Sequence, residues 1–235
     1  MLKICNVKLK QGSFNLDVPN ILVNEGKLIL LIGPNGSGKT TLLKTLAGLI
    51  DHTGDVLVNE TRSDVLGYKE RAKLFGYLPQ RVTLSEMLVK DFVLMGRFPY
   101  TRILSGYSKN DIDVVNKVSD DFGVSEYLDR DISGLSQGEF QRVLLAKVFA
   151  QSPKVLLLDE PTTSLDIGHK HSVRDQIMDY KRTNTNSIII ISTHEPELFE
   201  NMSDGFIMLK NGRVFKQGDK KLYNRDDFKE LFDLK

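Results

Sequence analysis

A short glycine-rich stretch has the residue types and the spacing that hold a phosphate group. Residues 33–40 read GPNGSGKT, which fits the pattern G-x-x-x-x-G-K-[ST], with an apolar run before them and a helix-forming stretch after them. Glycines let backbone N–H groups wrap round a β-phosphate, because no Cβ stands in the way. Lys39 is placed to reach the β- and γ-phosphates, and the hydroxyl of Thr40 to bind Mg²⁺. An ordinary glycine-rich turn is the weaker interpretation, and we predict a nucleoside triphosphate site.

Two adjacent carboxylates end an apolar run far along the chain. Residues 155–158 read VLLL, and Asp159 and Glu160 follow them. A phosphate loop needs a further carboxylate that organises Mg²⁺ at the end of another buried strand. We expect Asp159 to bind the metal through its water shell and Glu160 to polarise a water beside the γ-phosphate. The two acids could instead cap the next helix, but beside a phosphate loop they favour nucleotide hydrolysis.

A third stretch could bind an anion without any catalytic side chain. Residues 135–143 read LSQGEFQRV, with no nucleophile and base, no metal-ligand spacing and no paired acids. The small polar residues Ser136, Gln137 and Gly138 run directly into a stretch of helical periodicity at 140–146. A chain presents the N–H groups of a helix N-terminus to an anion in this way.

The elements that would position these residues alternate along the chain. Short apolar runs at 28–32, 155–158 and 188–191 alternate with helical patterns, which predicts a parallel sheet covered by helices. Their unbroken apolar character is typical of strands that are buried on both faces. Residues 1–25 and 54–60 alternate in polarity and look antiparallel. The predicted fold class is therefore α/β.

Three further segments add detail to this pattern. Residues 82–134 contain no long β run and predict a helical insertion between two elements of the sheet. Asn211-Gly212, between two apolar runs, is a strong hairpin signal. Residues 226–232 predict an amphipathic closing helix, with partner binding as the alternative. The apolar positions that carry the periodicity of the insertion are Ile112, Val115, Val118 and Phe122.

The composition limits the partners of the protein. The chain has 235 residues, enough for one substantial α/β domain, and its 32 basic and 31 acidic residues leave a net charge of +1. That balance gives no reason to expect nucleic acid or anionic lipid as the main partner. Cys5 is the one cysteine, so we expect no internal disulfide and a small core residue there. No signal peptide is evident and no apolar run approaches the about 20 residues that span a bilayer, so we expect a cytoplasmic protein whose membrane role depends on a partner.

Together the motifs resemble the nucleotide-binding subunit of ATP-binding cassette (ABC) transporters over nearly the whole chain. Residues 33–40 look like its Walker A motif, residues 155–160 look like its Walker B motif, and LSQGE at 135–139 is similar to its signature, usually LSGGQ. Gln80, after Gly-Tyr-Leu-Pro, looks like the Q-loop glutamine, and His194, after Ile-Ser-Thr, looks like the switch histidine. The order and spacing of these pieces make the resemblance specific.

The resemblance implies an architecture and a set of functional residues. The architecture is a P-loop NTPase of the ABC ATPase type: a single domain over 1–235, with a mainly parallel core sheet, an N-terminal antiparallel β-subdomain and an inserted helical subdomain near 82–134. The implied catalytic residues are Glu160, His194 and Gln80, and the implied Mg²⁺ ligands are Thr40, Gln80 and Asp159. Ser164-Leu165-Asp166 resembles the D-loop, in which Asp166 is the functional residue. The residues implied around ATP are Gly33, Pro34, Asn35, Gly36, Ser37, Gly38, Lys39, Thr40, Thr41 and, beside the adenine, Phe14.

The resemblance also implies which anion meets the helix that follows Ser136. The family signature binds the γ-phosphate of ATP held by a second copy of the chain, so each site is complete only when two cassettes meet head to tail. The implied trans residues are Ser136, Gln137, Gly138 and Glu139. Two of them depart from the family, because Gln137 replaces a glycine and Glu139 replaces a glutamine. If position 137 needs a left-handed backbone, a residue other than glycine costs about 1–2 kcal/mol there.

The adenine site is a second departure from the family. The family stacks an aromatic residue on the base just after the first strand, where this chain reads KQGSF at 10–14. Phe14 could serve there or pack in the core, and both interpretations stay open.

Residues 93–100, VLMGRFPY, resemble the corresponding segment of importers for iron–siderophore, haem and vitamin B12. That resemblance implies a membrane permease whose cytoplasmic helix fits a groove between Gln80 and Arg102, and an extracytoplasmic solute-binding protein. The ATPase would then lie on the inner face of the cell membrane. Alternatively, three residues of the segment only pack the helical insertion: Arg97, Phe98 and Tyr100.

Other functional classes fit the sequence less well. A soluble ABC-type ATPase that acts on ribosomes or DNA is the main alternative, but such proteins usually carry two cassettes or a long coiled-coil insertion. This chain shows neither, and it has no basic excess. A P-loop kinase or GTPase would have no use for the signature, for Gln80 or for His194.

Overall fold

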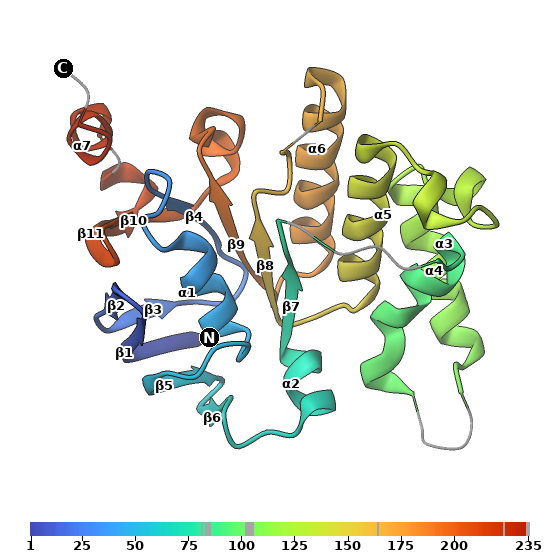
Figure 1. Ribbon diagram of the computed structural model, residues 1–235, viewed down its shortest axis with the longest axis horizontal. Helices are drawn as coiled ribbons and strands as arrows, with labels where there is room; N and C mark the ends of the chain where they lie inside the picture. Colours follow the sequence, from blue (N-terminus) through green and yellow to red (C-terminus); the bar gives the residue numbers. More distant parts are fainter. Residues whose placement is uncertain (81, 83–85, 102–105, 164, 223, 234–235) are drawn as a thin grey trace.

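The unbroken apolar runs form the centre of one mixed sheet. In the computed structural model, which describes residues 1–235 except 81, 83–85, 102–105, 164, 223 and 234–235, four of its strands run parallel side by side (Figure 1). In sheet order these are β4 (Leu28–Ile32), β9 (Ile188–Thr193), β8 (Val155–Asp159) and β7 (Phe75–Leu78). The prediction of buried parallel strands from 28–32, 155–158 and 188–191 is confirmed.

Alternate residues of the central strands face two separate cores. Leu156 and Leu158 of β8 pack in a cluster with Val173 and Ile177 of helix α6 (Ile167–Thr183). Leu157, between them in sequence, packs in a second cluster that contains the leucines of helix α1 (Lys39–Leu46). Because both faces of the strand are covered, every position must be apolar, which explains the absence of alternation in the sequence.

A second region of the same sheet is antiparallel. β1 (Leu2–Gln11) pairs with β2 (Phe14–Val18), β3 (Ile21–Val23) and β5 (Thr53–Val58), and β5 pairs in turn with the short β6 (Thr61–Arg62). This arrangement confirms the antiparallel prediction for the N-terminal part. Cys5 is half-buried rather than in the core, because side chains alternate along β1 and Cys5 lies on the face opposite the buried Leu2 and Ile4.

A hairpin joins the two regions of the sheet. β10 (Gly205–Lys210) lies parallel to β4 and antiparallel to β11 (Arg213–Asp219), and β11 meets β2 at the pair Arg213 and Asp17. Asn211 and Gly212 form the turn with φ of 50° and 75°, the two positive values of a type I′ turn. The hairpin prediction is therefore confirmed.

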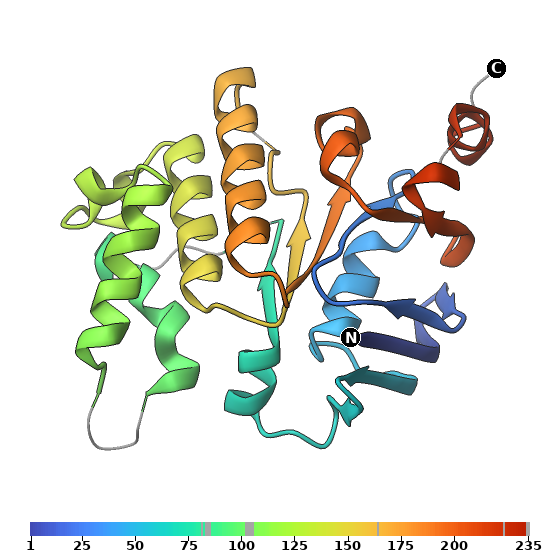
Figure 2. The ribbon, with the colours of Figure 1, turned by 180° about the vertical axis from the view of Figure 1, so that it is seen from behind.

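Between β7 and β8 the described residues form helices, turns and an isolated bridge, with no strand. Helices α3 and α4 stand away from the sheet, and α5 lies between them and α6 (Figures 1 and 2). Val115 and Phe122 are buried, Val118 is half-buried and Ile112 is exposed. The division into a helical subdomain near 82–134 within one domain over 1–235 stays a prediction. The helices of this region are α3 (Val89–Leu94), η1 (Met95–Tyr100), α4 (Lys109–Asp121), η2 (Ser125–Tyr127), η3 (Ile132–Gly134) and α5 (Gln137–Ala150).

The remaining helices lie outside this region. Among the described residues, none of the helices has both the length and the apolar character needed to cross a bilayer. The closing helix predicted at 226–232 is present as α7. The elements not yet named are α2 (Tyr68–Leu74), η4 (Pro196–Leu198), η5 (Glu200–Met202), η6 (Lys220–Leu222) and α7 (Arg225–Leu231).

Candidate nucleotide site

The glycine-rich loop connects β4 to α1 and needs its glycines. A Cβ on Gly33 would lie 2.4 Å from the carbonyl oxygen of Leu209, and Gly36 and Gly38 have φ of 77° and 105°. The hydroxyl of Ser37 is buried and has no hydrogen-bond partner among the described residues. The glycines therefore let the loop follow a tight curve between β4 and α1, the backbone form that can bind an anion.

Lys39, the first residue of α1, folds back over the loop. Its Nζ atom donates to the carbonyl oxygens of Gly33 at 2.6 Å and Pro34 at 3.2 Å. Burial lowers the pKa of Lys39, and the neighbouring carboxylates of Glu160 and Asp159 partly oppose that shift. A buried cation whose acceptors are neutral carbonyls gains a stronger partner when a triphosphate binds.

The carboxylate of Asp159 is buried at the carboxyl end of β8. It accepts hydrogen bonds from the hydroxyls of Ser192, on β9, and of Tyr77, on β7, the latter at 3.4 Å. Burial and the negative charge of Asp159 raise the pKa of Tyr77, so this hydroxyl stays a donor. The orientation of Asp159 is thus fixed by both neighbouring strands.

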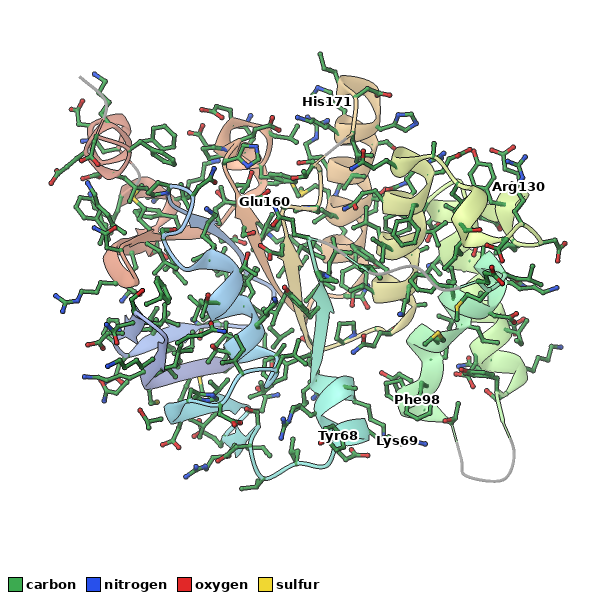
Figure 3. All side chains as sticks on the ribbon, in the orientation of Figure 1. Tyr68, Lys69, Phe98, Arg130, Glu160 and His171 are labelled. Atoms are coloured by element: carbon green, nitrogen blue, oxygen red, sulfur yellow. The ribbon has the colours of Figure 1, made fainter. Side chains whose placement is uncertain are left out.

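Glu160 follows β8 in a left-handed backbone conformation, with φ 50°. Few residues other than glycine adopt this region, and where they do, the surrounding structure must hold them there. The N–H of Glu160 donates to Ser192 twice, at 3.1 Å to the carbonyl and at 3.0 Å to the hydroxyl. These bonds to β9 aim the Glu160 side chain off the end of the sheet (Figure 3).

Three side chains surround the carboxylate of Glu160. Gln80, just after β7, donates to Oε2 at 2.8 Å, and Thr163 donates to the same oxygen at 3.1 Å. The Nδ1 atom of His194, just after β9, lies 3.6 Å from Oε1. The three predicted catalytic residues therefore meet at one carboxylate. Thr163 was not predicted, and no spacing in the sequence singles it out.

One cavity of about 800 Å³ joins the loop to this carboxylate. The cavity brings together the predicted residues of the loop and of the catalytic group, except that Ser37 and Asp159 lie buried behind its wall. Two lining residues, Gln11 and Phe232, were not predicted. The complete lining is Gln11, Phe14, Gly33, Pro34, Asn35, Gly36, Gly38, Lys39, Thr40, Thr41, Gln80, Glu160, His194 and Phe232.

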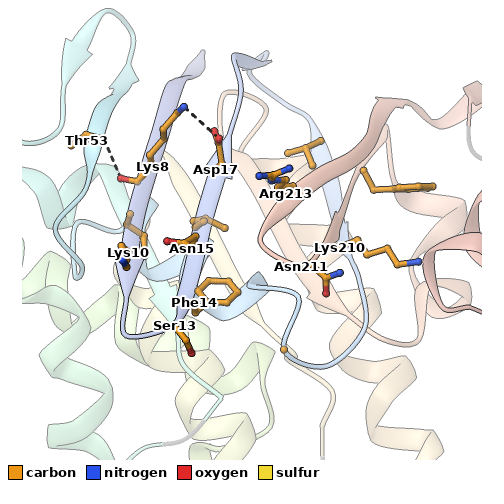
Figure 4. Close-up of a pocket in the computed structure, with 15 residues that line it drawn as sticks. Lys8, Lys10, Ser13, Phe14, Asn15, Asp17, Thr53, Lys210, Asn211 and Arg213 are labelled. Atoms are coloured by element: carbon orange, nitrogen blue, oxygen red, sulfur yellow. Dashed lines mark hydrogen bonds and ion pairs between the residues drawn. The ribbon is translucent and has the colours of Figure 1, made fainter.

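Phe14 combines both interpretations left open from the sequence. Its ring packs against the hydrophobic cluster that contains Leu157 and the leucines of α1, yet it also lines the cavity. The ring lies so close to the loop that a Cβ on Gly38 would be 2.7 Å from it. A second, shallower hollow of about 1150 Å³ lies on the other side of Phe14, between β1–β2 and β10–β11 (Figure 4).

Comparison with known proteins identifies the family. The family profile described as ABC transporter matches residues 16–163 of the 235. The chain belongs to the ABC transporter family. As a member of that family, it is an ATPase.

Individual relatives agree with this assignment. The cassette is 34% identical over 92% of its length to the iron(3+)-hydroxamate import ATP-binding protein FhuC of Bacillus subtilis, of which it covers 81%. It is 36% identical over 93% of its length to the hemin import ATP-binding protein HmuV of Gloeobacter violaceus, of which it covers 82%. Among solved structures, an ATP-binding subunit of an ABC transporter superposes with a TM-score of 0.81 at 26% identity, over 100% of the cassette and 94% of that chain. These comparisons confirm the predicted fold class.

The signature of the cassette begins helix α5 but does not line the cavity of its own chain. Ser136 is the N-cap, and its hydroxyl accepts from the N–H of Glu139 at 3.3 Å. The carboxylate of Glu139 accepts in return from the N–H of Ser136 at 2.7 Å. This is a capping box, which the S-x-x-E spacing could have predicted. Glu139, a departure from the family, therefore stabilises the helix start.

The backbone of Gln137 contradicts the strain considered from the sequence. Gln137 is the first residue of α5 and is not among the described non-glycine residues with positive φ. The hypothesis that this position costs energy because it needs a left-handed backbone is therefore wrong. Gly138 follows in the first turn of the helix and is half-buried, while Ser136 and Gln137 are exposed.

The D-loop of the cassette is described only in part. Ser164 lies outside the described residues. Asp166 is the N-cap of α6 and accepts from the N–H of His169 at 2.9 Å, and its other oxygen lies 2.7 Å from the ring Nδ1 of that histidine. The structure thus gives Asp166 a clear local role in starting a helix.

In the segment 93–100, some side chains pack in the interior and others are exposed to solvent. Arg97 is buried, pairs with Asp111 at 2.9 Å, donates to the carbonyl of Ala150 at 2.7 Å and stacks on Tyr100 at 3.9 Å. Phe98 points outward and is 56% exposed. Packing therefore explains Arg97 and Tyr100, but it does not explain Phe98.

Phe98 borders an apolar groove of about 450 Å³. The exposed Tyr68 and Leu49 lie on its rim, and Lys69 lies over the ring of Phe98 at 4.8 Å (Figure 3). Arg102, named in the sequence prediction, lies outside the described residues. The groove is lined by Ala47, Gly48, Leu49, Tyr68, Lys69, Arg71, Ala72, Phe75, Tyr77, Pro79, Val82, Phe98, Leu144, Lys147, Val148 and Gln151.

Proposed function

We propose that the cassette powers a membrane importer for a metal chelate, such as an iron–siderophore or haem, or for cobalamin. The observation that carries the ATPase part is the single carboxylate of Glu160, which gathers Gln80 and His194 at one end of the phosphate-loop cavity. The solute class rests on the VLMGRFPY segment and on the relatives, which are import proteins for iron-hydroxamate and hemin.

Binding of the triphosphate falls to the loop and to α1. Backbone N–H groups of the loop and of the start of α1 bind the β-phosphate, and Lys39 exchanges its carbonyl acceptors for phosphate oxygens. The donor set available for Mg²⁺ consists of the hydroxyl of Thr40, the amide oxygen of Gln80 and the carboxylate of Asp159, which are the hard oxygen ligands that this ion prefers. When bound, Mg²⁺ neutralises charge on the β- and γ-phosphate oxygens.

Glu160 acts as the general base in hydrolysis. Its Oε2 atom is occupied by Gln80 and Thr163, which fixes the carboxylate and leaves Oε1 to accept a proton from water. His194, half-exposed beside Oε1, is placed to contact the γ-phosphate. The oxygen of the attacking water bonds to the γ-phosphorus, and the proton of the water passes to Glu160. The bond between the γ-phosphorus and the oxygen that bridges it to the β-phosphate breaks, so that ADP leaves with this oxygen and inorganic phosphate forms.

A second copy completes the site. The N-terminus of α5, with the exposed Ser136 and the half-buried Gly138, is absent from the cavity of its own chain. Such a terminus supplies N–H donors and a positive dipole to an anion. In a head-to-tail dimer, this surface meets the γ-phosphate held by the partner, and Asp166 lies at the same interface.

The groove beside Phe98 is the docking surface for the permease. It is apolar and its rim carries exposed aromatic residues, as expected for a site that receives a short helix of another protein. This contact would hold the ATPase on the inner face of the membrane, with an extracytoplasmic solute-binding protein on the other side.

Co-purification tests the whole proposal. Tagged cassette should bring down a polytopic membrane protein, and the cassette with Phe98→Asp should lose that partner while it keeps its ATP affinity. Metal chelates and cobalamin are then added to the complex in liposomes, and one of them should stimulate ATP hydrolysis. Recovery of ribosomes or DNA in place of a membrane protein would contradict the proposal.

A further inference from the structure

The nucleotide cavity has an aromatic wall that comes from the end of the chain. Three of its lining residues belong neither to the phosphate loop and α1 nor to the group around Glu160: Gln11, Phe14 and Phe232. Phe232 is the C-cap of α7, directly after Leu231, whose side chain is fully buried. Helix α7 lies beside the loop between β4 and α1 in both ribbon views (Figures 1 and 2).

Ion pairs and hydrogen bonds fasten α7 to the β10–β11 hairpin. The Nζ atom of Lys210 donates to the carbonyl of Glu230 at 2.8 Å and pairs with Asp233 at 2.7 Å. Lys216, on β11, pairs with Asp227. Together with the buried Leu231, these contacts fix the position of the following phenylalanine.

The turn of the same hairpin also hydrogen-bonds to the phosphate loop and to β2, the strand of Phe14. The N–H of Gly212 donates to the carbonyl of Ser37 in the phosphate loop at 2.9 Å. The carbonyl of Gly212 accepts from the N–H of Asp17 at 2.8 Å, on the strand that begins with Phe14. One turn therefore connects the phosphate loop, the strand of Phe14 and, through Lys210, the helix that ends at Phe232.

We propose that Phe232 contacts the adenine of bound ATP, so that the base lies between apolar surfaces from β2 and from the C-terminal helix. The inference rests on the proposed nucleotide site. Outside the phosphate loop, α1 and the group around Glu160, the lining of the cavity consists of two aromatic rings and one amide, Gln11. Aromatic rings bind the faces of a purine, and an amide can hydrogen-bond its edge. Phe232 thereby makes the C-terminal helix part of base recognition.

Phe228 offers a matched control on the same helix. Its ring centroid lies 4.4 Å from that of Phe232, and both rings pack against the same core, but Phe228 does not line the cavity. Leucine at either position keeps apolar packing and removes an aromatic face. Only Phe232→Leu should therefore affect a ligand in the cavity.

Calorimetry with two ligands tests the inference on the full chain. Loss of a base–aromatic contact typically weakens binding about 5-fold or more, so Phe232→Leu should weaken MgATP to this extent. Magnesium tripolyphosphate, which has no base, should bind Phe232→Leu and the wild type equally. Phe228→Leu should bind both ligands as the wild type does. The double variant Phe14→Leu/Phe232→Leu should bring the affinity for MgATP closer to that for tripolyphosphate.

Three results would overturn the inference. Unchanged or tighter MgATP binding by Phe232→Leu would show that the ring makes no favourable contact with the base. An equal loss of ATP and tripolyphosphate binding would give Phe232 a purely structural role. If the wild type bound neither ligand, the nucleotide site itself would be wrong, a failure that the wild-type titration alone reveals.

Discussion

Single residues carry the proposed chemistry of this cassette, and Glu160 is its proposed general base. Its left-handed backbone is a departure from ordinary conformational preference, held by two hydrogen bonds to Ser192. Its side chain is fixed by Gln80 and Thr163. A carboxylate that is positioned this firmly, with one oxygen left to accept a proton, has the geometry of a general base.

Replacing Glu160 with Gln should therefore stop turnover and preserve nucleotide binding. The amide oxygen of the variant can still accept from Gln80 and Thr163, but it cannot take a proton from water. Loss of a positioned base typically lowers the rate by about 10²–10⁴-fold. Single-turnover release of phosphate measures this rate, and titration with MgATP under the same conditions provides the control. A variant that turns over at the normal rate would exclude Glu160 as the base.

Gln137 gives a second prediction at this scale. Because the residue lies in the first turn of α5 with an ordinary backbone, glycine there relieves no strain. Gln137→Gly should instead lower the free energy of unfolding, by at most about 0.5–1 kcal/mol, the cost of glycine inside a helix. Urea unfolding measures the change. A variant more stable than the wild type would restore the strain hypothesis.

At the scale of elements, strand β7 connects two surfaces of the molecule. The ring of Tyr77 lines the apolar groove beside Phe98, and its hydroxyl reaches the buried carboxylate of Asp159. A partner helix in the groove would contact the same side chain that orients the predicted metal ligand. We therefore infer that Tyr77 is a positioning residue between the proposed docking surface and the phosphate site.

Tyr77→Phe should raise the Mg²⁺ concentration needed for half-maximal ATPase activity by a few-fold. The ring, and hence the groove, stays, but Asp159 loses a donor and gains freedom to rotate. Tyr100→Phe is the matched control, because it removes a hydroxyl that donates to the carbonyl of Gln151 and does not reach Asp159. An identical Mg²⁺ dependence in both variants would show that the Tyr77 hydroxyl has no positioning role.

The sequence predicted elements where local and tertiary preferences agree. Buried strands such as Val155–Asp159 are apolar at every position but the last, and Asn211-Gly212 suits a type I′ turn, in which both residues have positive φ. Cys5 was placed wrongly in the core, because a small apolar residue suggests burial, whereas the alternation along β1 puts this position on the face opposite Leu2 and Ile4. Phe232 was placed in the closing helix, but its position at the cavity could not be predicted, because it depends on how Lys210 and Lys216 hold that helix.

The same distinction holds for the site. The motifs predicted Lys39, Glu160 and His194. Glu160 and His194 directly follow strands of the central sheet, and Lys39 begins the helix that follows another of these strands. Parallel strands bring such positions to one edge of the sheet. Thr163 and Gln11 were not predicted from the sequence, because neither belongs to a motif whose spacing indicates a chemical role. Contacts made by side chains across separate elements are visible only in the folded chain.

At the scale of the whole molecule, the cassette separates its nucleotide loop from its signature. The signature begins α5, whereas the loop precedes α1, and the cavity of one chain includes none of the residues Ser136, Gln137, Gly138 and Glu139. In the proposed mechanism, a single chain therefore offers ATP a phosphate loop and a base but leaves one side of the γ-phosphate open. Two chains placed head to tail would close two such sites at once.

The nucleotide is then part of the dimer interface, and hydrolysis should release the two chains. Wild-type protein should be monomeric, because without nucleotide little joins the two surfaces. Glu160→Gln, which keeps ATP intact, should accumulate as a dimer when MgATP is added. Size-exclusion chromatography with light scattering measures the mass in each case. Glu160→Gln combined with Lys39→Ala is the control, since loss of the lysine should prevent ATP binding and leave the protein monomeric. A Glu160→Gln protein that binds MgATP but stays monomeric would refute the shared site and would leave the assignment of the phosphate loop intact.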